Sequence, residues 1–496
     1  MADINKAIKP VESVRIAPLN DGALYQANKE IKFRLGAGLD MWLVNKSYLN
    51  FNIKCKSRTA AGGDGFTNAL ATAIPAGATA DEVAAIANNF QPTYIRNANN
   101  IFRTIEVYYG GDCIYTTKTH NIHQTTVKQL KWGDNYLDSN WATYTTSNMI
   151  LKEKNDYLKF KNATAGTANS RDLERAEQTI YNVQIPMNQL LPIFMDVDSS
   201  GFPMRSLNQQ IEVRLYIADP YMYLVDWDTT NNKNDFVTGG NPTRVNTGLA
   251  DSSDWTTGGS MENRFRASDI TLDNVYIYAN YYTPDANEAA IIDDKCANGS
   301  YKLKYNVWEF DERQVASIQP SANIPMSVVT SNTKSILVYA FRKQTSPSVM
   351  YKPNIHNFQL KFTPHVAPLQ PISGSTMETP HEYKFQVDDV LNNIDTYYCS
   401  TNSDYNRCYM FEDQTAGTKI GTNVTNPSSS FVIFGMNYVS DPTDLGADSS
   451  DWNSQYQINY NGVTDTANGA GLQFVIAVNV ECGLIIKDHK IFTFTL

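Results

Sequence analysis

The sequence predicts an all-β protein made of two tandem eight-stranded jelly-roll barrels with long loops and a few short helices. Short runs of β-branched and aromatic residues with period-two alternation recur in both halves, separated by polar or Gly-rich breaks. At 496 residues the chain exceeds what one hydrophobic core usually serves, so two domains are expected. Neither half carries a convincing catalytic or phosphate-binding motif. We therefore expect a structural function that depends on the shape of the protein and on its assembly.

The composition is that of a folded protein whose task is not to coat nucleic acid. Hydrophobic residues make up 42% of the chain and charged residues 19%, and the 11% aromatic content favours strands. With 41 basic and 51 acidic residues, the formal charge of −10 opposes phosphate binding, so no sequence-specific nucleic-acid partner is expected. Met1–Pro10 lacks the apolar core of a signal peptide, and no run approaches the roughly 20 apolar residues of a membrane helix. A soluble, non-secreted protein is therefore expected.

The first half opens with two predicted strands, Lys29–Leu35 and Lys46–Cys55. Apolar and polar side chains alternate along both, which puts one set on the core face. The predicted inward set is Ile31, Phe33, Leu35, Leu49, Phe51 and Ile53. An excursion rich in Ala, Gly and Thr follows at Ser57–Asn100, and a capping-box pattern inside it predicts a short helix at Thr79–Phe90.

A hairpin is predicted next, because Arg103–Tyr109 and Cys113–Thr117 flank Gly110 and Gly111, and glycine tolerates the positive φ that two-residue hairpin turns require. Further strands of the first half are predicted at Ala176–Pro186, Gln210–Ile217 and Ile270–Tyr282. The long polar interval Asp226–Glu262 is expected to project as a loop over the rigid barrel.

Pro284 ends the last of these strands and marks the most even division of the chain, into domains 1–284 and 285–496. A short helix is predicted at Asp285–Lys295, with Ala289 and Ile292 facing the body. Eight strands, the number a jelly roll needs, are predicted beyond it. They are Tyr301–Phe310, Ser335–Arg342, Ile355–Phe362, Glu382–Val387, Phe431–Tyr438, Gln455–Tyr460, Gly471–Val480 and Lys490–Leu496.

The cysteines do not form a metal or redox motif. None of the six belongs to a CxxC pair, so free buried thiols are expected and a zinc ribbon is unsupported. Cys399 and Cys408 are close enough in sequence to bridge in a loop, but an intracellular chain would usually keep them reduced. The other four are Cys55, Cys113, Cys296 and Cys482.

Other polar patterns are better explained as structure than as chemistry. An HxxH pair lacks the acidic partner of a metalloprotease, a GxG is followed by no suitable helix, and an Asp-rich turn lacks the later glutamate of a calcium loop. Two acidic pairs are interpreted as solvated loop faces. These residues are His120 and His123, Gly36 and Gly38, Asp196 and Asp198, Asp293 and Asp294, and Asp388 and Asp389. No catalytic, cofactor-binding or metal-ligating residue is predicted, and no cofactor.

The order of segments resembles the double jelly-roll major capsid proteins of virophages, Polinton-like viruses and their relatives. The resemblance rests on "IKFRLGAGLDMWLVNKSYLNFNIK" (Ile31–Lys54), "RNANNIFRTIEVYYGGDCIYTTKTHN" (Arg96–Asn121), "YNVQIPMNQLLPIFMDVDSSGFPMRSLNQQIEVRLYI" (Tyr181–Ile217), "DITLDNVYIYANYYT" (Asp269–Thr283) and "LQFVIAVNVECGLIIKDHKIFTFTL" (Leu472–Leu496). In that family a "SYL" strand precedes a hairpin, an Ile-Pro-x-x-x-Leu-Leu turn and a closing strand. The match covers almost the whole chain in order, although each piece is diffuse.

The resemblance implies a non-enzymatic structural protein of the virion, assembled inside the host cell. Three copies, with two barrels each, would form a pseudo-hexagonal homotrimeric capsomer that tiles an icosahedral shell. The implied partners are other copies of the chain, neighbouring capsomers, and minor capsid or penton proteins. An internal membrane is left open.

Two other functions are compatible with the sequence. Jelly rolls also form lectins, so a carbohydrate- or receptor-binding spike or fibre protein could use the loop residues Trp227, Trp255 and Trp452. A glycoside hydrolase on a β-sandwich would need two carboxylates facing one cleft, and no such pair is evident in the sequence.

Overall fold

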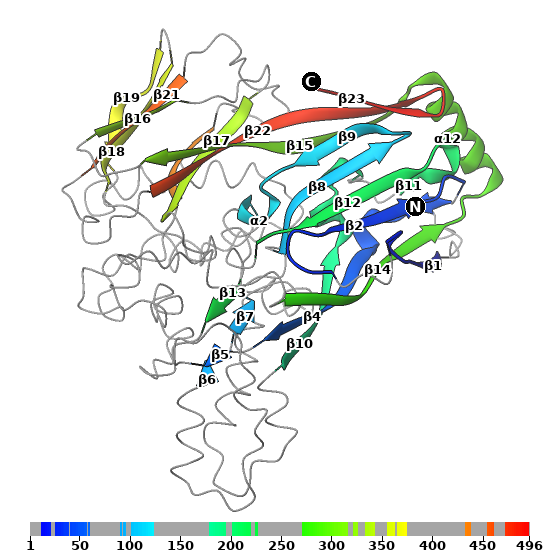
Figure 1. Ribbon diagram of the computed structural model, residues 1–496. Helices are drawn as coiled ribbons and strands as arrows, with labels where there is room; N and C mark the ends of the chain where they lie inside the picture. The colour runs from blue at the N-terminus through cyan, green and yellow to red at the C-terminus, as the bar shows by residue number, and fades with distance from the viewer. Residues whose placement is uncertain are drawn as a thin grey trace, which may run out of the picture.

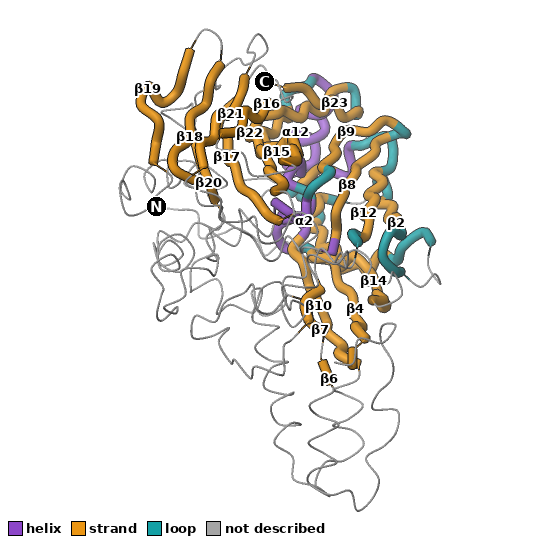
Figure 2. The backbone as a smooth tube through the Cα atoms, turned by 60° about the vertical axis from the view of Figure 1, so that its left-hand side comes forward, coloured by secondary structure: helices purple, strands orange, loops and turns teal. Residues whose placement is uncertain are grey.

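The computed structural model contains two β-rich halves joined by one helix (Figures 1 and 2). It describes residues 11–20, 25–38, 40–56, 58–59, 90–91, 93–95, 101–123, 178–194, 201–219, 224–226, 270–315, 321–325, 333–342, 355–362, 365–373, 432–437, 454–460 and 472–495. Among these residues, no helix is long and apolar enough to cross a membrane.

Two antiparallel sheets form the first half. A six-stranded sheet has the order β10-β4-β14-β3-β11, with β1 on the free side of β14, and a four-stranded sheet has the order β2-β12-β8-β9. The bounds of the first sheet are β1 Val11–Ile16, β3 Met41–Trp42, β4 Tyr48–Lys56, β10 Gln178–Pro186, β11 Phe202–Pro203 and β14 Ile270–Tyr282. Those of the second are β2 Glu30–Leu35, β8 Phe102–Tyr109, β9 Asp112–Thr117 and β12 Ile211–Ile217.

Short elements connect or extend these strands. The small strands pair as β5 Arg58–Thr59 with β6 Phe90–Gln91, and β7 Thr93–Ile95 with β13 Leu224–Asp226. The helical turns are η1 Val44–Lys46, α2 His120–His123, α8 Met187–Leu190, η4 Pro192–Phe194 and η5 Met204–Ser206. The linking helix is α12, Ala286–Asn298.

The second half repeats this design. A five-stranded sheet has the order β15-β22-β17-β20 with β23 on β22, and a four-stranded sheet has the order β16-β21-β18-β19. The bounds of the first sheet are β15 Tyr301–Val315, β17 Thr333–Arg342, β20 Val432–Asn437, β22 Leu472–Lys487 and β23 Lys490–Thr495. Those of the second are β16 Ser321–Pro325, β18 Ile355–Phe362, β19 His365–Ser373 and β21 Ser454–Tyr460.

The pairing order identifies two jelly rolls with the same connectivity. Taken in chain order, the strands β1, β2, β4, β8, β9, β10, β12 and β14 correspond one by one to β15 through β22. The sheet β1-β14-β4-β10 then matches β15-β22-β17-β20, and β2-β12-β8-β9 matches β16-β21-β18-β19. Each jelly roll therefore has eight principal strands in two antiparallel sheets, which confirms the predicted fold class.

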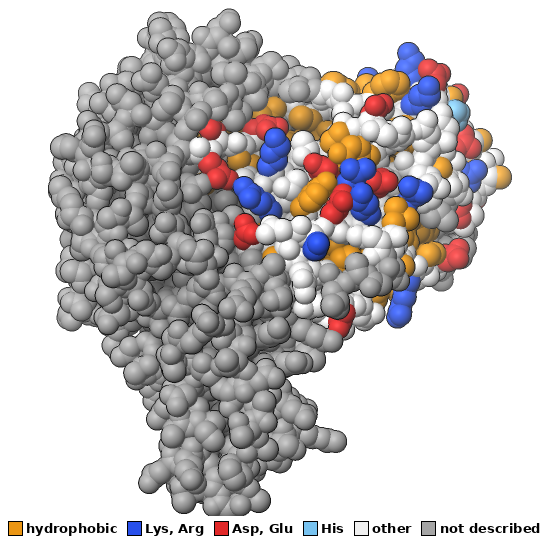
Figure 3. All heavy atoms as spheres, viewed as in Figure 1, with side chains coloured by type: hydrophobic (Ala, Val, Ile, Leu, Met, Phe, Trp, Pro, Cys, Tyr) orange, Lys and Arg blue, Asp and Glu red, His pale blue; other side chains and the backbone are white. Residues whose placement is uncertain are grey.

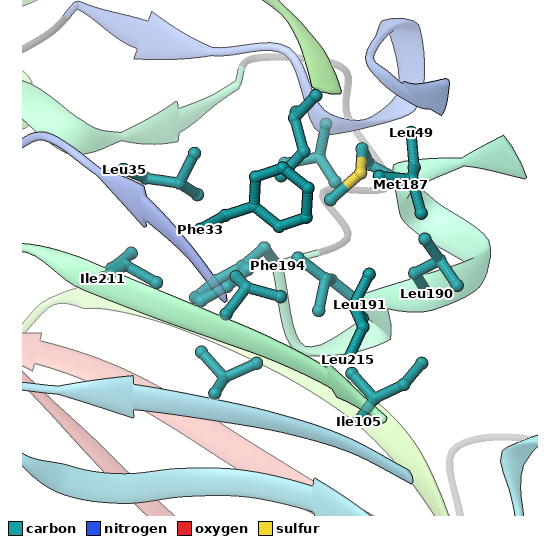
Figure 4. Close-up of a cluster of buried hydrophobic side chains, with 14 of the residues drawn as sticks. Phe33, Leu35, Leu49, Ile105, Met187, Leu190, Leu191, Phe194, Ile211 and Leu215 are labelled. Carbon is teal, nitrogen blue, oxygen red and sulfur yellow. The ribbon is translucent and has the colours of Figure 1, made fainter. Parts of the chain in front are cut away.

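The core of the first jelly roll follows the predicted alternation. All six side chains of the predicted inward set have no exposed surface. The turn after β10 fills the space between the sheets, because Met187, Leu190, Leu191 and Phe194 point inward among Phe33, Leu35 and Ile211 (Figure 4). One outward position departs from the pattern: Asn50 on β4 is also buried, and its side-chain amide donates to the Asn274 carbonyl oxygen at 3.4 Å.

Most strand predictions hold, with instructive differences at the edges. The Gly110–Gly111 hairpin forms as predicted, with φ of 62° and 101° at the two glycines. Among the principal strands of the two jelly rolls, three were not predicted: β1, β16 and β19. Proline discourages a strand assignment, and β16 ends in Pro325 while β19 contains two prolines, which it tolerates as the outermost strand of its sheet. Strand Lys490–Leu496 forms as β23, an addition to the eight.

Several predictions lie wholly or partly outside the described residues. These are the helix at Thr79–Phe90, of which only Phe90 is described and lies in strand β6, the loop Asp226–Glu262 beyond β13, and the strand Glu382–Val387. The helix at Asp285–Lys295 forms as α12, and the Asp285 carboxylate caps it by accepting from the amides of Asn287 and Glu288. Ala289 is buried and Ile292 packs against the core, as predicted.

An ionic cluster around the buried carboxylate of Glu481 stabilises the second jelly roll. Lys304 Nζ on β15 lies 3.0 Å from the Glu481 carboxylate on β22, and Lys334 on β17 pairs with the other carboxylate oxygen. Burial acts to raise the pKa of Glu481, but hydrogen bonds from the two lysines outweigh it and hold the pKa below its ordinary value. The ionised form of Glu481 is therefore favoured by folding.

We expect Glu481→Gln to remove the contribution of this carboxylate to the free energy of unfolding, together with the pH dependence of that contribution. A carboxyl with a lowered folded pKa stabilises the protein above its unfolded pKa of about 4.5, and this stability is lost as pH falls through the folded pKa. Urea unfolding at pH 7 and pH 4 should show a smaller loss of stability on acidification in the variant than in the wild type. An equal loss in both proteins would contradict the assignment.

A second prediction concerns the first core. Phe51 has no exposed surface and packs edge to face on Phe102 with ring centroids 5.6 Å apart, so Phe51→Ala should lower the free energy of unfolding by about 3–5 kcal/mol. Phe492 on β23 is 51% exposed and provides the matched control, for which Phe492→Ala should cost about 1 kcal/mol or less. Denaturant unfolding measures both, and similar losses would contradict the core assignment.

Candidate functional site: the junction between the two jelly rolls

The two jelly rolls share one hydrophobic core. Strands β15 and β22 are the longest of the described strands and extend past the rest of the second jelly roll to run alongside β8 and β9 (Figures 1 and 2). β15 contacts η4 and β9, β23 contacts β9, and α12 contacts η5. Side chains from α12, β15, β22 and β23 belong to the same buried cluster as the first core: Cys296, Tyr305, Val307, Leu484, Ile486 and Ile491.

Aromatic rings connect the two halves across the junction. Phe194 contacts Phe202 with centroids 4.6 Å apart, and Phe202 meets Tyr301 of β15 edge to face at 6.4 Å. The Tyr301 hydroxyl also donates to the Gly201 carbonyl oxygen at 3.3 Å. On the β9 side, Tyr115 meets Tyr305 edge to face at 6.4 Å. Such edge-to-face pairs add directional preference to apolar burial, so the two halves have a defined mutual orientation.

The turn between β22 and β23 docks on the first jelly roll through hydrogen bonds. The Tyr109 hydroxyl donates to the His489 carbonyl oxygen at 2.8 Å and lies 2.7 Å from Asn208 Oδ1. The backbone N–H of Asn208 donates to the same carbonyl oxygen at 3.2 Å. His489 Nδ1 lies 2.8 Å from the Ser206 carbonyl oxygen, which can only accept, so Nδ1 carries the ring proton. We call Tyr109, Ser206, Asn208 and His489 the polar clasp.

The clasp holds a turn whose backbone is otherwise unfavourable. Asp488 and His489 both have positive φ, 49° and 61°, in the two-residue connection where a glycine is usual. The amides of Asp488 and His489 donate to the carbonyls of Ala297 and Cys296 at the end of α12, at 3.2 and 3.4 Å. Contacts from both the first jelly roll and the linking helix therefore fix this turn.

Helix α12 contributes a carboxylate to the same region. Ser206 Oγ donates to Asp293 Oδ1 at 2.5 Å, and Arg205 Nη2 lies 3.6 Å from Asp293 Oδ2. Asp293 and Asp294 lie on a helix and not in the predicted loop. Asp294 is exposed, as the interpretation as a solvated face expects, whereas Asp293 pairs with η5. The sequence could not indicate this pairing, since the partners lie 87 positions away.

The side chains of this site hold the two jelly rolls together, and its buried thiol and phenol keep their protons. Cys296 has no exposed surface, and burial raises the pKa of its thiol to about 11, so the nucleophilic thiolate is scarce at neutral pH. Burial likewise raises the pKa of the Tyr109 phenol, which keeps its donor proton. Three cysteines are described as free thiols, Cys113, Cys296 and Cys482, while Cys55, Cys399 and Cys408 lie outside the residues whose side chains are described.

The polar motifs of the sequence that the structure describes lie on separate elements. His120 and His123 form the single turn α2 after β9, where the His120 side chain is buried, and Gly38 lies in the turn after β2 with φ of 85°. Within the described part of the chain, no group of three His, Cys, Asp or Glu side chains could hold a metal ion. Lying outside the described residues are Asp196, Asp198, Asp388, Asp389, Trp227, Trp255 and Trp452.

The outer face of the four-stranded sheet β2-β12-β8-β9 is a self-paired charged surface. Arg214 Nε lies 2.6 Å from Glu212 Oε1, and its guanidinium lies over the Tyr108 ring at 4.1 Å. The hydroxyls of Tyr108 and Tyr216 both donate to Glu106, at 3.0 and 3.1 Å. Basic and acidic side chains are interleaved across the visible face of the first jelly roll (Figure 3). On this face Arg214, Glu212 and Glu106 find partners among the side chains of the same sheet.

Comparison with known proteins supports the fold. The PBCV-1 virus capsid structure superposes with a TM-score of 0.51 at 11% identity, over 98% of this chain and 97% of that one. The crystal structure of the mavirus major capsid protein also gives 0.51, at 10% identity, over 97% and 90% of the two chains. No protein-family model matches the sequence, and no curated protein is significantly similar to it. The matches confirm the double jelly-roll fold that the resemblance implied.

The polar clasp predicts how far the free energy of unfolding should fall when one hydroxyl group is removed. Tyr109→Phe keeps the ring but removes the donor to His489, so the free energy of unfolding should fall by about 1 kcal/mol. Tyr278→Phe is the matched control, because this half-buried ring stacks on Tyr48 and its hydroxyl makes no hydrogen bond in the described part of the chain, so it should cost less than about 0.5 kcal/mol. Thermal and denaturant unfolding measure both variants, and equal effects would argue against the clasp.

Proposed function

We propose that this chain is a major capsid protein, a structural and non-catalytic subunit that forms pseudo-hexagonal homotrimeric capsomers tiling an icosahedral viral shell. The observation that carries the proposal is the duplicated jelly roll held rigidly by a shared core. Two similar barrels in a fixed relation, repeated around a threefold axis, give six similar barrels and an outline that packs without gaps. Cyclic symmetry closes each capsomer at three copies.

The same proposal places the domains at 1–284 and 285–496 and the protein in the virion capsid. All strand pairings among the described residues join strands on one side of α12, which agrees with this division. The PBCV-1 capsid structure and the mavirus major capsid protein have the same fold, and the capsid role of those proteins supports the same role here. Minor capsid or penton proteins would fill the positions that a sixfold tile cannot occupy.

The carbohydrate-binding alternative predicts a different behaviour in solution. A lectin-like spike would bind glycans through exposed loops, whereas a capsomer needs large contact surfaces between copies. The observation that decides between them is the assembly state of the pure protein and its binding to a glycan array.

Mass photometry and negative-stain electron microscopy test the proposed function. Mass photometry of the purified chain should give the mass of three copies, and averaged images viewed down the threefold axis should have a hexagonal outline. Co-expression with the minor capsid proteins of the same virus should yield closed shells. A protein that remains monomeric at all concentrations and forms no shell would overturn the proposal.

A further inference from the structure

A buried asparagine on β22 makes no hydrogen bond with its side chain. Asn479 has no exposed surface, and among the described residues neither its Nδ2 nor its Oδ1 has a partner. Ser335 lies directly opposite it in the β17–β22 pair and is also fully buried, with a hydroxyl that has no partner in the same part of the chain. Because unpaired polar groups in a dry interior are costly, their presence here calls for an explanation.

A glutamate and a lysine lie beside this asparagine. Glu481 follows Asn479 by two positions on β22, so both side chains project from the same face of the strand. The Glu481 carboxylate contacts Nζ of Lys334 on β17, and the two residues are only 5% and 8% exposed. The amine of Lys334 is therefore held on the side of the sheet that carries the Asn479 amide.

A bulge in β17 brings the lysine to this face. Thr333 is opposite Val480 and Ser335 is opposite Asn479, so Lys334 is an extra residue without a counterpart on β22. Bulges of this kind re-aim a side chain that regular alternation would place on the other face. Lys334 thereby reaches Glu481, although its neighbour Ser335 projects toward the same face.

The surroundings favour nucleophilic attack by this amine. Trp308 on β15 is the other strand partner of Asn479 and is 9% exposed, and the next pair along the same face, Leu337 and Ala477, has no exposed surface. An apolar environment disfavours the ammonium form of a lysine, and the neutral amine is a nucleophile. The Glu481 carboxylate, in contact with Nζ, is placed to accept the proton.

We propose that Lys334 and Asn479 form an isopeptide bond that joins β17 to β22, with Glu481 as the general base. Glu481 takes a proton from the Lys334 ammonium, and the freed lone pair of Nζ forms a bond to Cγ of Asn479. The bond from Cγ to Nδ2 then breaks. The attacking nitrogen gives up a second proton and keeps one as an amide, and the two released protons leave with Nδ2 as ammonium, which returns Glu481 to its carboxylate form. The reaction needs no oxidant or other co-reactant.

This reaction accounts for the unpartnered polar groups. It converts the unpaired Nδ2 of Asn479 into the departing ammonium, and the Ser335 hydroxyl is the donor opposite Oδ1 as negative charge develops on that oxygen. The new bond also ties β22 to the second jelly roll where β22 leaves it, because β17 pairs with β22 as far as Val480 and β23 pairs with it from Cys482 onward. The isopeptide bond does not depend on the proposed function.

Mass spectrometry of the intact, denatured full-length protein tests the bond. The wild-type chain should be lighter than its sequence by one ammonia molecule, and its proteolytic digest should contain a branched peptide in which Lys334 is joined to Asn479. Lys334→Met and Asn479→Ala remove one reacting group each, and Glu481→Gln removes the base, so all three variants should keep their full mass. A wild-type chain with the full mass of its sequence would refute the proposal.

Two neighbouring side chains provide matched controls. Lys304 contacts the other oxygen of the Glu481 carboxylate, but its side chain is 62% exposed and stays protonated, so Lys304→Met should still lose one ammonia. Asn306, opposite Glu481 on β15, is half-buried, and Asn306→Ala should behave in the same way. Circular dichroism checks that the variants keep the wild-type fold. A mass loss that persists in Lys334→Met would assign it to ring closure of an asparagine and exclude the cross-link.

Discussion

The structure depends on the hydrophobic core that passes from one jelly roll into the other. Leu484, Ile486 and Tyr305 come from the second half of the chain but are buried in the same cluster as the first core. Separating the halves would expose these side chains to water, and each large apolar side chain contributes roughly 1.5–3 kcal/mol when buried. The two jelly rolls are therefore held together as one block, which is the property that the proposed capsomer requires.

Apolar burial alone does not fix an angle between two barrels, because it has no direction. The polar clasp supplies that direction at the β22–β23 turn, where Tyr109, Asn208 and Ser206 all reach His489. The positive φ at Asp488 and His489 costs on the order of 1 kcal/mol each, and the surrounding hydrogen bonds offset it. The strained turn persists because two separate parts of the fold hold it.

The two jelly rolls have the same strand connectivity although their sequences differ. The two jelly rolls have the same order of principal strands, yet the first adds β3 and β11 to one sheet and the second adds β23. Strand β15, with 15 residues, is also much longer than its counterpart β1, with 6. Of these differences, β15 and β23 are the ones that reach the first jelly roll.

The sequence by itself determined the fold class, most strand positions and the inward faces, because period-two alternation is a local property that residues such as Ile31, Phe33 and Leu35 carry with them. Among the principal strands it missed β16 and β19, whose prolines mask their strand character, and β1, which is too exposed to alternate clearly. Only the tertiary structure decided that Asp293 pairs with Ser206, or that His489 meets Tyr109 from 380 positions away. Such contacts depend on how two sheets come together in space, and no short stretch of sequence encodes that arrangement.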